Sequence, residues 1–237
     1  MFLYQPQNGY CYNSDTHFLY SFITICLKKF KNIQGELLDI GSGSGILGLL
    51  VIRDYKKLNL NQVEIQENFQ FLSQKNSEIN SISNTLFKGS LFKIEFNKQF
   101  DYIVSNPPFY HSNVIKSENQ NIKIARYNEN MPLENFIKKV SQILKPRGKF
   151  FFCYDVKQLD DIISLLKEHK LNIEVMQFLH PKQTKDATLV MIYARKNSKS
   201  LLNVISPLIM FDDASNFTTN VQNIYEKCAT HSIKVDI

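Results

Sequence analysis

The sequence predicts an α/β domain built on a doubly wound, mostly parallel sheet with one antiparallel edge strand. Apolar runs of strand length alternate with amphipathic runs of helix length through most of the 237 residues, a pattern typical of a parallel sheet with helices on both faces. A glycine-rich turn joins the first of these strands to a helix. The last two strand-like runs have no helix between them, so we expect them to pair antiparallel.

The expected elements follow from these patterns in chain order. The first helix is expected at 12–30, with Asn13, Ser14 or Asp15 as its cap. Apolar residues at helical spacing predict further helices at 45–57, 67–80, 133–145 and 156–170. Strands are expected at 35–41, 61–66, 85–89, 100–105, 149–155, 172–181 and 187–196. We expect residues 1–237 to form one domain, with 1–34 as an N-terminal helical cap segment and 197–237 as a tail packed on it.

The composition sets limits on the class of protein. Lysine and arginine outnumber the acids by 28 to 22, and the resulting charge of +6 is a modest surplus for a polyanionic partner. The four cysteines and five histidines show no metal-ligand spacing, so we expect no metal. No apolar run reaches the length of about 18 residues that a membrane span needs, so we expect none. We expect a cytoplasmic monomer.

The stretch "DIGSGSGILG" joins the first strand to the next helix. Its plainest interpretation is a tight turn, but three glycines alternating with serines exceed what a turn needs and favour a cofactor loop. Gly41, Gly43 and Gly45 fit the G-x-G-x-G spacing of S-adenosylmethionine loops, with Asp39 before them. Gly43 and Gly45 also fit, with Gly48, the G-x-G-x-x-G fingerprint of dinucleotide sites. The loop alone therefore leaves the cofactor open.

Further candidate cofactor residues follow the second and third strands. Glu64 lies at the end of the second strand, where an acid binds ribose hydroxyls in either cofactor class. Its alternative role is a solvated charge at a strand end. Ser90 and Leu91 follow the third strand, in "KGSLF". Many methyltransferases carry an acid at the Ser90 position to bind the adenine amino group, and a serine can still accept one hydrogen bond.

The stretch "SNPPFY" follows the fourth strand. Two prolines stop a strand, which is its structural interpretation. At the carboxyl end of a strand beside the glycine loop, a functional interpretation is stronger. The side-chain oxygen of Asn106 and the carbonyl of Pro107 would accept both hydrogens of one exocyclic amine, which frees the nitrogen lone pair for attack on a methyl-sulfonium. Phe109 would stack on the base.

Together, "DIGSGSG" and "FDYIVSNPPFY" resemble the class I S-adenosylmethionine-dependent amino-methyltransferases with an (N/D)PP(Y/F) motif. Within this superfamily, the chain bears a closer resemblance to the bacterial enzymes that methylate N6 of adenine 37 in valine tRNA. Four stretches carry this closer resemblance: "YQPQNGYCYNSDTHFL", "IARYN", "FLHPKQTKDATLVMIYARK" and "PLIMFDDASNFTTNVQNIY". The resemblance implies a Rossmann-like fold, S-adenosylmethionine as cofactor and a tRNA anticodon loop as partner.

Alternatives remain at this point. The same chemistry could act on a glutamine of a release factor or on a guanine of rRNA. A NAD-dependent oxidoreductase and a catalytically silent RNA-binding module are more remote. If the partner is RNA, the candidate phosphate contacts are lysines and an arginine in three stretches: Lys28, Lys29, Lys31, Lys116, Lys123, Arg126, Lys182 and Lys185.

Overall fold

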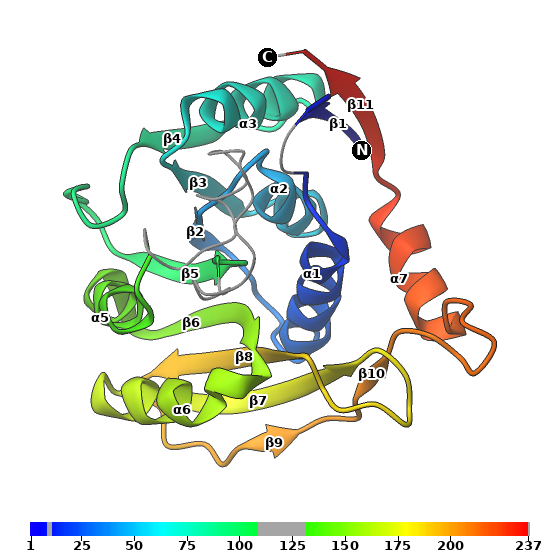
Figure 1. Cartoon of the computed structure of the whole chain (residues 1–237). Coiled ribbons are helices and arrows are strands. Elements are labelled where there is room, and N and C mark those ends of the chain that lie inside the picture. Colours follow the sequence, from blue (N-terminus) through cyan, green and yellow to red (C-terminus); the bar gives the residue numbers. More distant parts are fainter. Residues whose placement is uncertain (9–10, 109–130, 237) are drawn as a thin grey trace.

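A computed structural model describes residues 1–8, 11–108 and 131–236 of the chain. Its centre is a nine-stranded sheet with the order β10-β7-β8-β6-β5-β2-β3-β4, and β9 pairs with β7. Figure 1 shows this sheet running through the molecule with helices packed along it. The alternation of strands and helices in the sequence therefore predicted the fold class correctly.

The parallel part of the sheet holds the predicted loops at one edge. It consists of β2 (Gly35–Ile40), β3 (Leu58–Glu64), β4 (Asn84–Lys88), β5 (Phe100–Ser105) and β6 (Leu144–Asp155). Strand β2 pairs in parallel with β3 on one side and with β5 on the other. Strand order thus reverses at β2, and such a switch point is where sheets of this type bind ligands.

The last two long strands, β7 (Leu171–His180) and β8 (Leu189–Lys196), pair antiparallel as predicted. Strand β8 also pairs antiparallel with β6, so it lies between β6 and β7 rather than at the outermost position. The chain crosses from β6 to β7 through α6 (Leu159–Glu168) and leaves room for one strand between them. Strand β8, which follows β7 with no helix between them, occupies that position. Short strands β9 (Asn203–Val204) and β10 (Leu208–Ile209) pair with the outer edge of β7.

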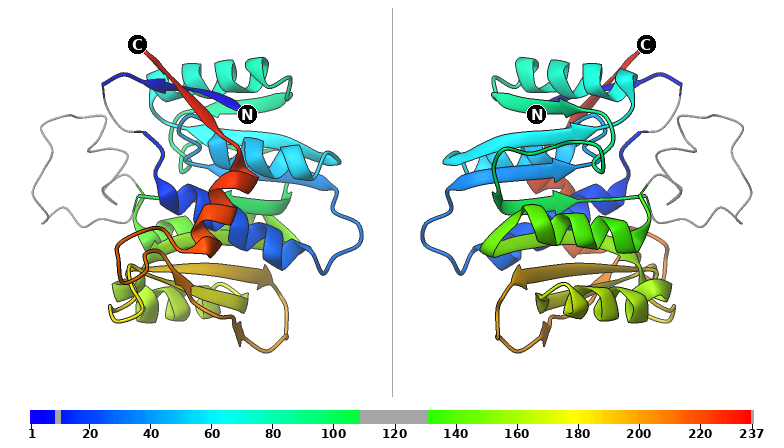
Figure 2. Two further views of the ribbon diagram at one scale, coloured as in Figure 1. Left: turned by 90° about the vertical axis from the view of Figure 1, so that its right-hand side faces the viewer. Right: turned by 90° about the vertical axis from the view of Figure 1, so that its left-hand side faces the viewer.

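Helices cover both faces of the sheet. Figure 2 shows α1 (Ser14–Leu27), α2 (Ile46–Asp54) and α3 (Glu67–Ile79) on one face, with α7 (Thr219–Cys228) beside α1. The other face carries α5 (Leu133–Ile143) and α6, and a single 3₁₀ turn, η2 (Val156–Gln158), precedes α6. Most of α1 is buried, because it packs between the sheet and the C-terminal helix. Asn13 is its N-cap residue.

The two ends of the chain form an element that the sequence did not predict. Strand β1 (Phe2–Pro6) pairs in parallel with β11 (His231–Val235). The side chain of Asn76 on α3 fixes β1 in place, since it accepts from the Tyr4 N–H at 2.6 Å and donates to the Tyr4 carbonyl at 3.0 Å. The segment 1–34 therefore contains a strand as well as the expected helix. The strand was not predicted because pairing partners so distant in sequence leave no local pattern.

Candidate active site

A cavity opens at the carboxyl ends of β2, β3 and β5. Its walls include the glycine loop after β2, the segments that follow β3 and β4, the start of the loop after β5, and α1. Seven predicted site residues line it: Asp39, Gly41, Gly43, Glu64, Ser90, Leu91 and Asn106. Gly45 and Pro107 are buried behind this lining, whereas Phe109 lies outside the described residues. The fold thus brings together residues from four separate stretches of the sequence.

The glycine loop has a left-handed backbone at three positions, with φ of +66° at Gly41, +54° at Gly43 and +89° at Gly45. A Cβ at Gly45 would come within 2.9 Å of the Gln62 amide nitrogen and 3.1 Å of the Ser73 hydroxyl. A Cβ at Gly43 would meet nothing within 4 Å. Gly45 is therefore required for packing beneath the loop, while Gly43 leaves open space on the cavity side, as a ligand-binding loop needs.

Glu64 ties the end of β3 to the glycine loop. One carboxylate oxygen accepts from the Gly43 N–H at 2.7 Å, and the other accepts from the N–H groups of Ile65 and Gln66, both at 2.9 Å. Burial raises the pKa of Glu64 above its usual value, although these three donors oppose the shift. A carboxylate offers about four acceptor positions, so Glu64 retains one for a ligand in the cavity.

Asp39 is a second buried carboxylate beneath the loop, with 1% of its surface exposed. Its Oδ2 accepts from the Gly48 N–H at 2.9 Å, at the start of α2. Burial raises the pKa of Asp39 to about 7, and the nearby charge of Glu64 contributes to this shift. Two like charges close together in a partly dry cavity favour a ligand that brings positive charge and hydroxyl donors.

Two further polar groups in the cavity were missed by the sequence analysis. The Ser42 hydroxyl and the Gln66 side-chain oxygen are buried and have no hydrogen-bond partner within the described ranges. An unpaired buried polar atom is costly, so both atoms suit a polar ligand. The serines that alternate with the glycines, and the start of α3 three residues after Glu64, were the signals available in the sequence. The residue set fits S-adenosylmethionine.

Strand register places Asn106 beside the glycine loop. Ser105 pairs with Ile40 of β2 and with Phe152 of β6, so Asn106 lies opposite Gly41 on one side and Cys153 on the other. The Asn106 amide nitrogen donates to the Thr16 hydroxyl at 3.1 Å, and its oxygen accepts from the Cys153 thiol at 3.0 Å. Strand β5 ends at Ser105, as the two prolines predicted.

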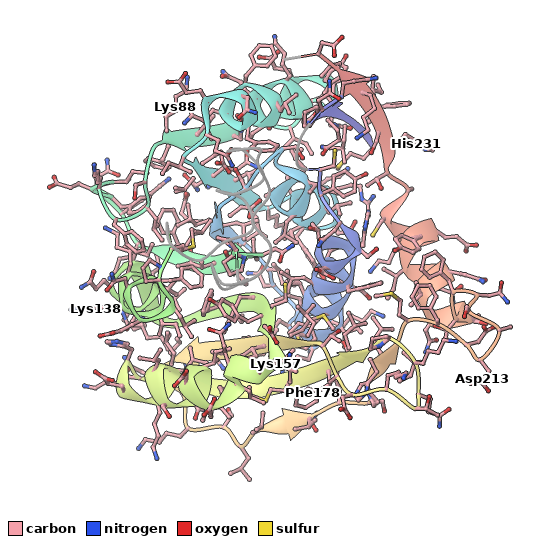
Figure 3. All side chains as sticks on the ribbon, viewed as in Figure 1. Lys88, Lys138, Lys157, Phe178, Asp213 and His231 are labelled. Carbon is pink, nitrogen blue, oxygen red and sulfur yellow. The ribbon has the colours of Figure 1, made fainter. Side chains whose placement is uncertain are left out.

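Five candidate phosphate contacts lie in the part of the chain that the structure describes, and none of them lines this cavity: Lys28, Lys29, Lys31, Lys182 and Lys185. Helix α1 starts beside Asn106 and is 14 residues long, so Lys28, Lys29 and Lys31 lie about 20 Å away, by the rise per helical residue. Lys182 donates to the Asp213 carbonyl and the Ser215 hydroxyl. Lys116, Lys123 and Arg126 lie outside the described residues. Figure 3 likewise shows Lys88, Lys138 and Lys157 on separate parts of the surface.

Two observations concern metals and membranes. In the part of the chain that the structure describes, no group of three or more His, Cys, Asp or Glu side chains is placed to hold a metal ion. Within the same ranges, no helix combines the length and apolar character that crossing a membrane requires.

Comparisons with known proteins cover most of the residues that line the cavity. Residues 23–177 match the family model described as the methyltransferase small domain, a stretch that includes the glycine loop, Glu64 and Asn106. A protein of Pedobacter heparinus named tRNA1(Val) (adenine(37)-N6)-methyltransferase is 28% identical over 162 residues, which cover 65% of this chain and 67% of that protein. A release factor glutamine methyltransferase of Fusobacterium nucleatum is 27% identical over 163 residues, covering 62% and 45% respectively.

Solved structures support the fold. A protein of Agrobacterium tumefaciens described as a predicted O-methyltransferase superposes with a TM-score of 0.66 at 17% identity, over 93% of this chain and 99% of that chain. At this level of identity the likeness concerns the fold alone. It confirms the predicted fold class.

Proposed function

The chain belongs to the methyltransferase small domain family, and we propose that it methylates the N6 amine of an adenine in RNA, adenine 37 of a valine tRNA. It is an enzyme, and S-adenosylmethionine is its cofactor. The observation that carries the choice of acceptor is the position of Asn106, at the wall of the cofactor cavity and directly after β5, with Pro107 buried next to it. The similarity to the Pedobacter protein supports the choice of RNA.

The glycine loop and its two carboxylates would hold the cofactor. Glu64 has one acceptor position left for a ribose hydroxyl, and Gly41 and Gly43 let the ligand approach the backbone. Asp39 adds negative charge under the loop. Ser90 and Leu91 would contact the adenine, since both line the cavity and Leu91 is apolar and buried. When bound, S-adenosylmethionine supplies an electrophilic methyl group.

Asn106 and Pro107 would bind the target amine. The Asn106 oxygen has two lone pairs, of which the Cys153 thiol occupies one. The other lone pair and the Pro107 carbonyl would accept the two amine hydrogens and favour a pyramidal nitrogen whose lone pair is free to attack. Catalysis would then rest on position and electrostatics. Phe109 is proposed to stack on the adenine ring.

Transfer of a labelled methyl group to defined acceptors tests this proposal. We expect label from S-adenosylmethionine to enter a valine tRNA transcript and to leave a release factor unlabelled. Label in the release factor instead would favour glutamine as the acceptor, which the Fusobacterium relative makes the second candidate. No label in either would contradict the proposal. A cytoplasmic location and a monomeric state stay predictions.

A further inference from the structure

Asn106 is held from two sides by buried residues that come from distant parts of the chain. Thr16 lies in the first turn of α1 and is 4% exposed, and Cys153 lies in β6 and is fully buried. The Asn106 nitrogen is 3.1 Å from the Thr16 hydroxyl oxygen, and the Asn106 oxygen is 3.0 Å from the Cys153 sulfur. The first loop residue after β5 is thus fixed by its side chain.

The orientation of this amide matters because its two ends have opposite chemistry. The terminal torsion of asparagine is broad and roughly two-fold, so the oxygen and nitrogen can exchange places at little intrinsic cost. An oxygen toward the target amine accepts its hydrogen, whereas a nitrogen there would set two donors against each other. Something in the protein must therefore select one orientation.

Cys153 is suited to make this selection. Burial holds the pKa of its thiol well above the usual value, and the nearby Asp15 charge adds to the effect. The thiol therefore keeps its proton at neutral pH and acts as a donor. A donor at this position favours the amide oxygen over the amide nitrogen, while the Thr16 hydroxyl accepts from the other end of the amide.

We propose that Cys153, assisted by Thr16, is a positioning residue that fixes the Asn106 amide with its oxygen available to the target amine. The catalytic role of this orientation rests on the proposed function. The orientation itself is a property of the free protein. A thiol donor in β6 would then be part of the catalytic arrangement without touching the substrate or the cofactor.

Three variants at position 153 separate donation from packing. Cys153→Ser keeps a donor, Cys153→Val fills the space without one, and Cys153→Ala removes both donor and volume. Two readouts are needed: single-turnover methyl transfer to the tRNA transcript, and the Asn106 side-chain amide signals in a ¹⁵N NMR spectrum, assigned by their loss in Asn106→Asp. The affinity for S-adenosylmethionine and the thermal midpoint serve as controls for folding.

We expect Cys153→Val and Cys153→Ala to slow transfer about tenfold, the size of one lost hydrogen bond, and to shift the two Asn106 amide proton signals. Cys153→Ser should keep transfer within about twofold of wild type. A valine variant with wild-type transfer and unchanged amide signals would overturn the proposal, as would a serine variant as slow as valine. If the wild type methylates no RNA, the proposed function fails, while the amide signals still decide the role of Cys153.

Discussion

The loops after β2 and β5 are neighbours in the sheet, but different parts of the chain hold them. The glycine loop is fixed through its backbone, since N–H groups of Gly43 and Gly48 donate to the buried carboxylates of Glu64 and Asp39. The loop after β5 begins with a side chain, Asn106, that is fixed by two other side chains. One loop is shaped by main-chain geometry and the other by the orientation of a single amide.

The two loops should therefore tolerate different substitutions. A backbone loop with left-handed residues responds to any Cβ placed in it, so its specificity lies in the glycines. A side-chain site responds to the loss of one functional group and leaves the fold intact. We therefore expect substitutions in the first loop to affect stability and cofactor binding, and substitutions around the second loop to affect the rate of transfer.

Asn106→Ala should have the largest effect. It removes the acceptor proposed to activate the amine, and loss of one such preorganised group costs about 10²–10³ in kcat. S-adenosylmethionine affinity, measured by calorimetry, should change little, because the glycine loop is held independently. The matched control is Asn223→Ala, at an exposed position on α7. Equal loss of cofactor binding and turnover in Asn106→Ala would mean that the two loops are not separate.

Gly45→Ala and Gly43→Ala should affect the first loop differently. Gly45→Ala combines a positive φ with contacts under 3.2 Å, so we expect it to cost about 2–4 kcal/mol of unfolding free energy in urea titrations. Gly43→Ala has open space around it and should cost about 1 kcal/mol, while weakening cofactor binding. If both variants lost the same unfolding free energy, the contacts beneath Gly45 would not be the cause of the loss.

Glu64→Gln tests the carboxylate that joins loop and strand. A glutamine keeps the size but sets an NH₂ group against one of the three backbone donors. We expect about a tenfold rise in the dissociation constant for S-adenosylmethionine, with kcat at saturating cofactor near wild type. A fall in kcat with unchanged cofactor affinity would mean that Glu64 acts on the rate of transfer, as the loop after β5 does, and not on cofactor binding.

The pH dependence of cofactor binding should show the smallest effect. Because burial raises the pKa of Asp39 to about 7, part of this carboxyl is protonated in the free protein at slightly acidic pH. A cationic ligand prefers the ionised form, so binding releases protons and affinity rises as pH increases toward about 7. We expect a rise of several-fold that is absent in Asp39→Asn. The same rise in that variant would exclude Asp39 as its source.

The sequence predicted most of the fold, because apolar periodicity is a local signal that each strand and helix carries within itself. It also predicted both loops, because glycines and prolines mark backbone geometry directly. It did not predict Thr16 or Cys153 as partners of Asn106, since each looks like an ordinary buried residue in its own element and only strand register and helix packing bring them together. The sequence did not predict the pairing of β1 with β11 for the same reason.

The loops after β2 and β5 are proposed to form one site for methyl transfer to an adenine amine. Mass spectrometry of nucleosides from a valine tRNA transcript, incubated with the protein and S-adenosylmethionine, tests it most directly. We expect N6-methyladenosine with the wild type and none with Asn106→Ala. A methyl group on a ring nitrogen, on guanine or on no nucleoside at all, or N6-methyladenosine formed equally well by Asn106→Ala, would contradict it.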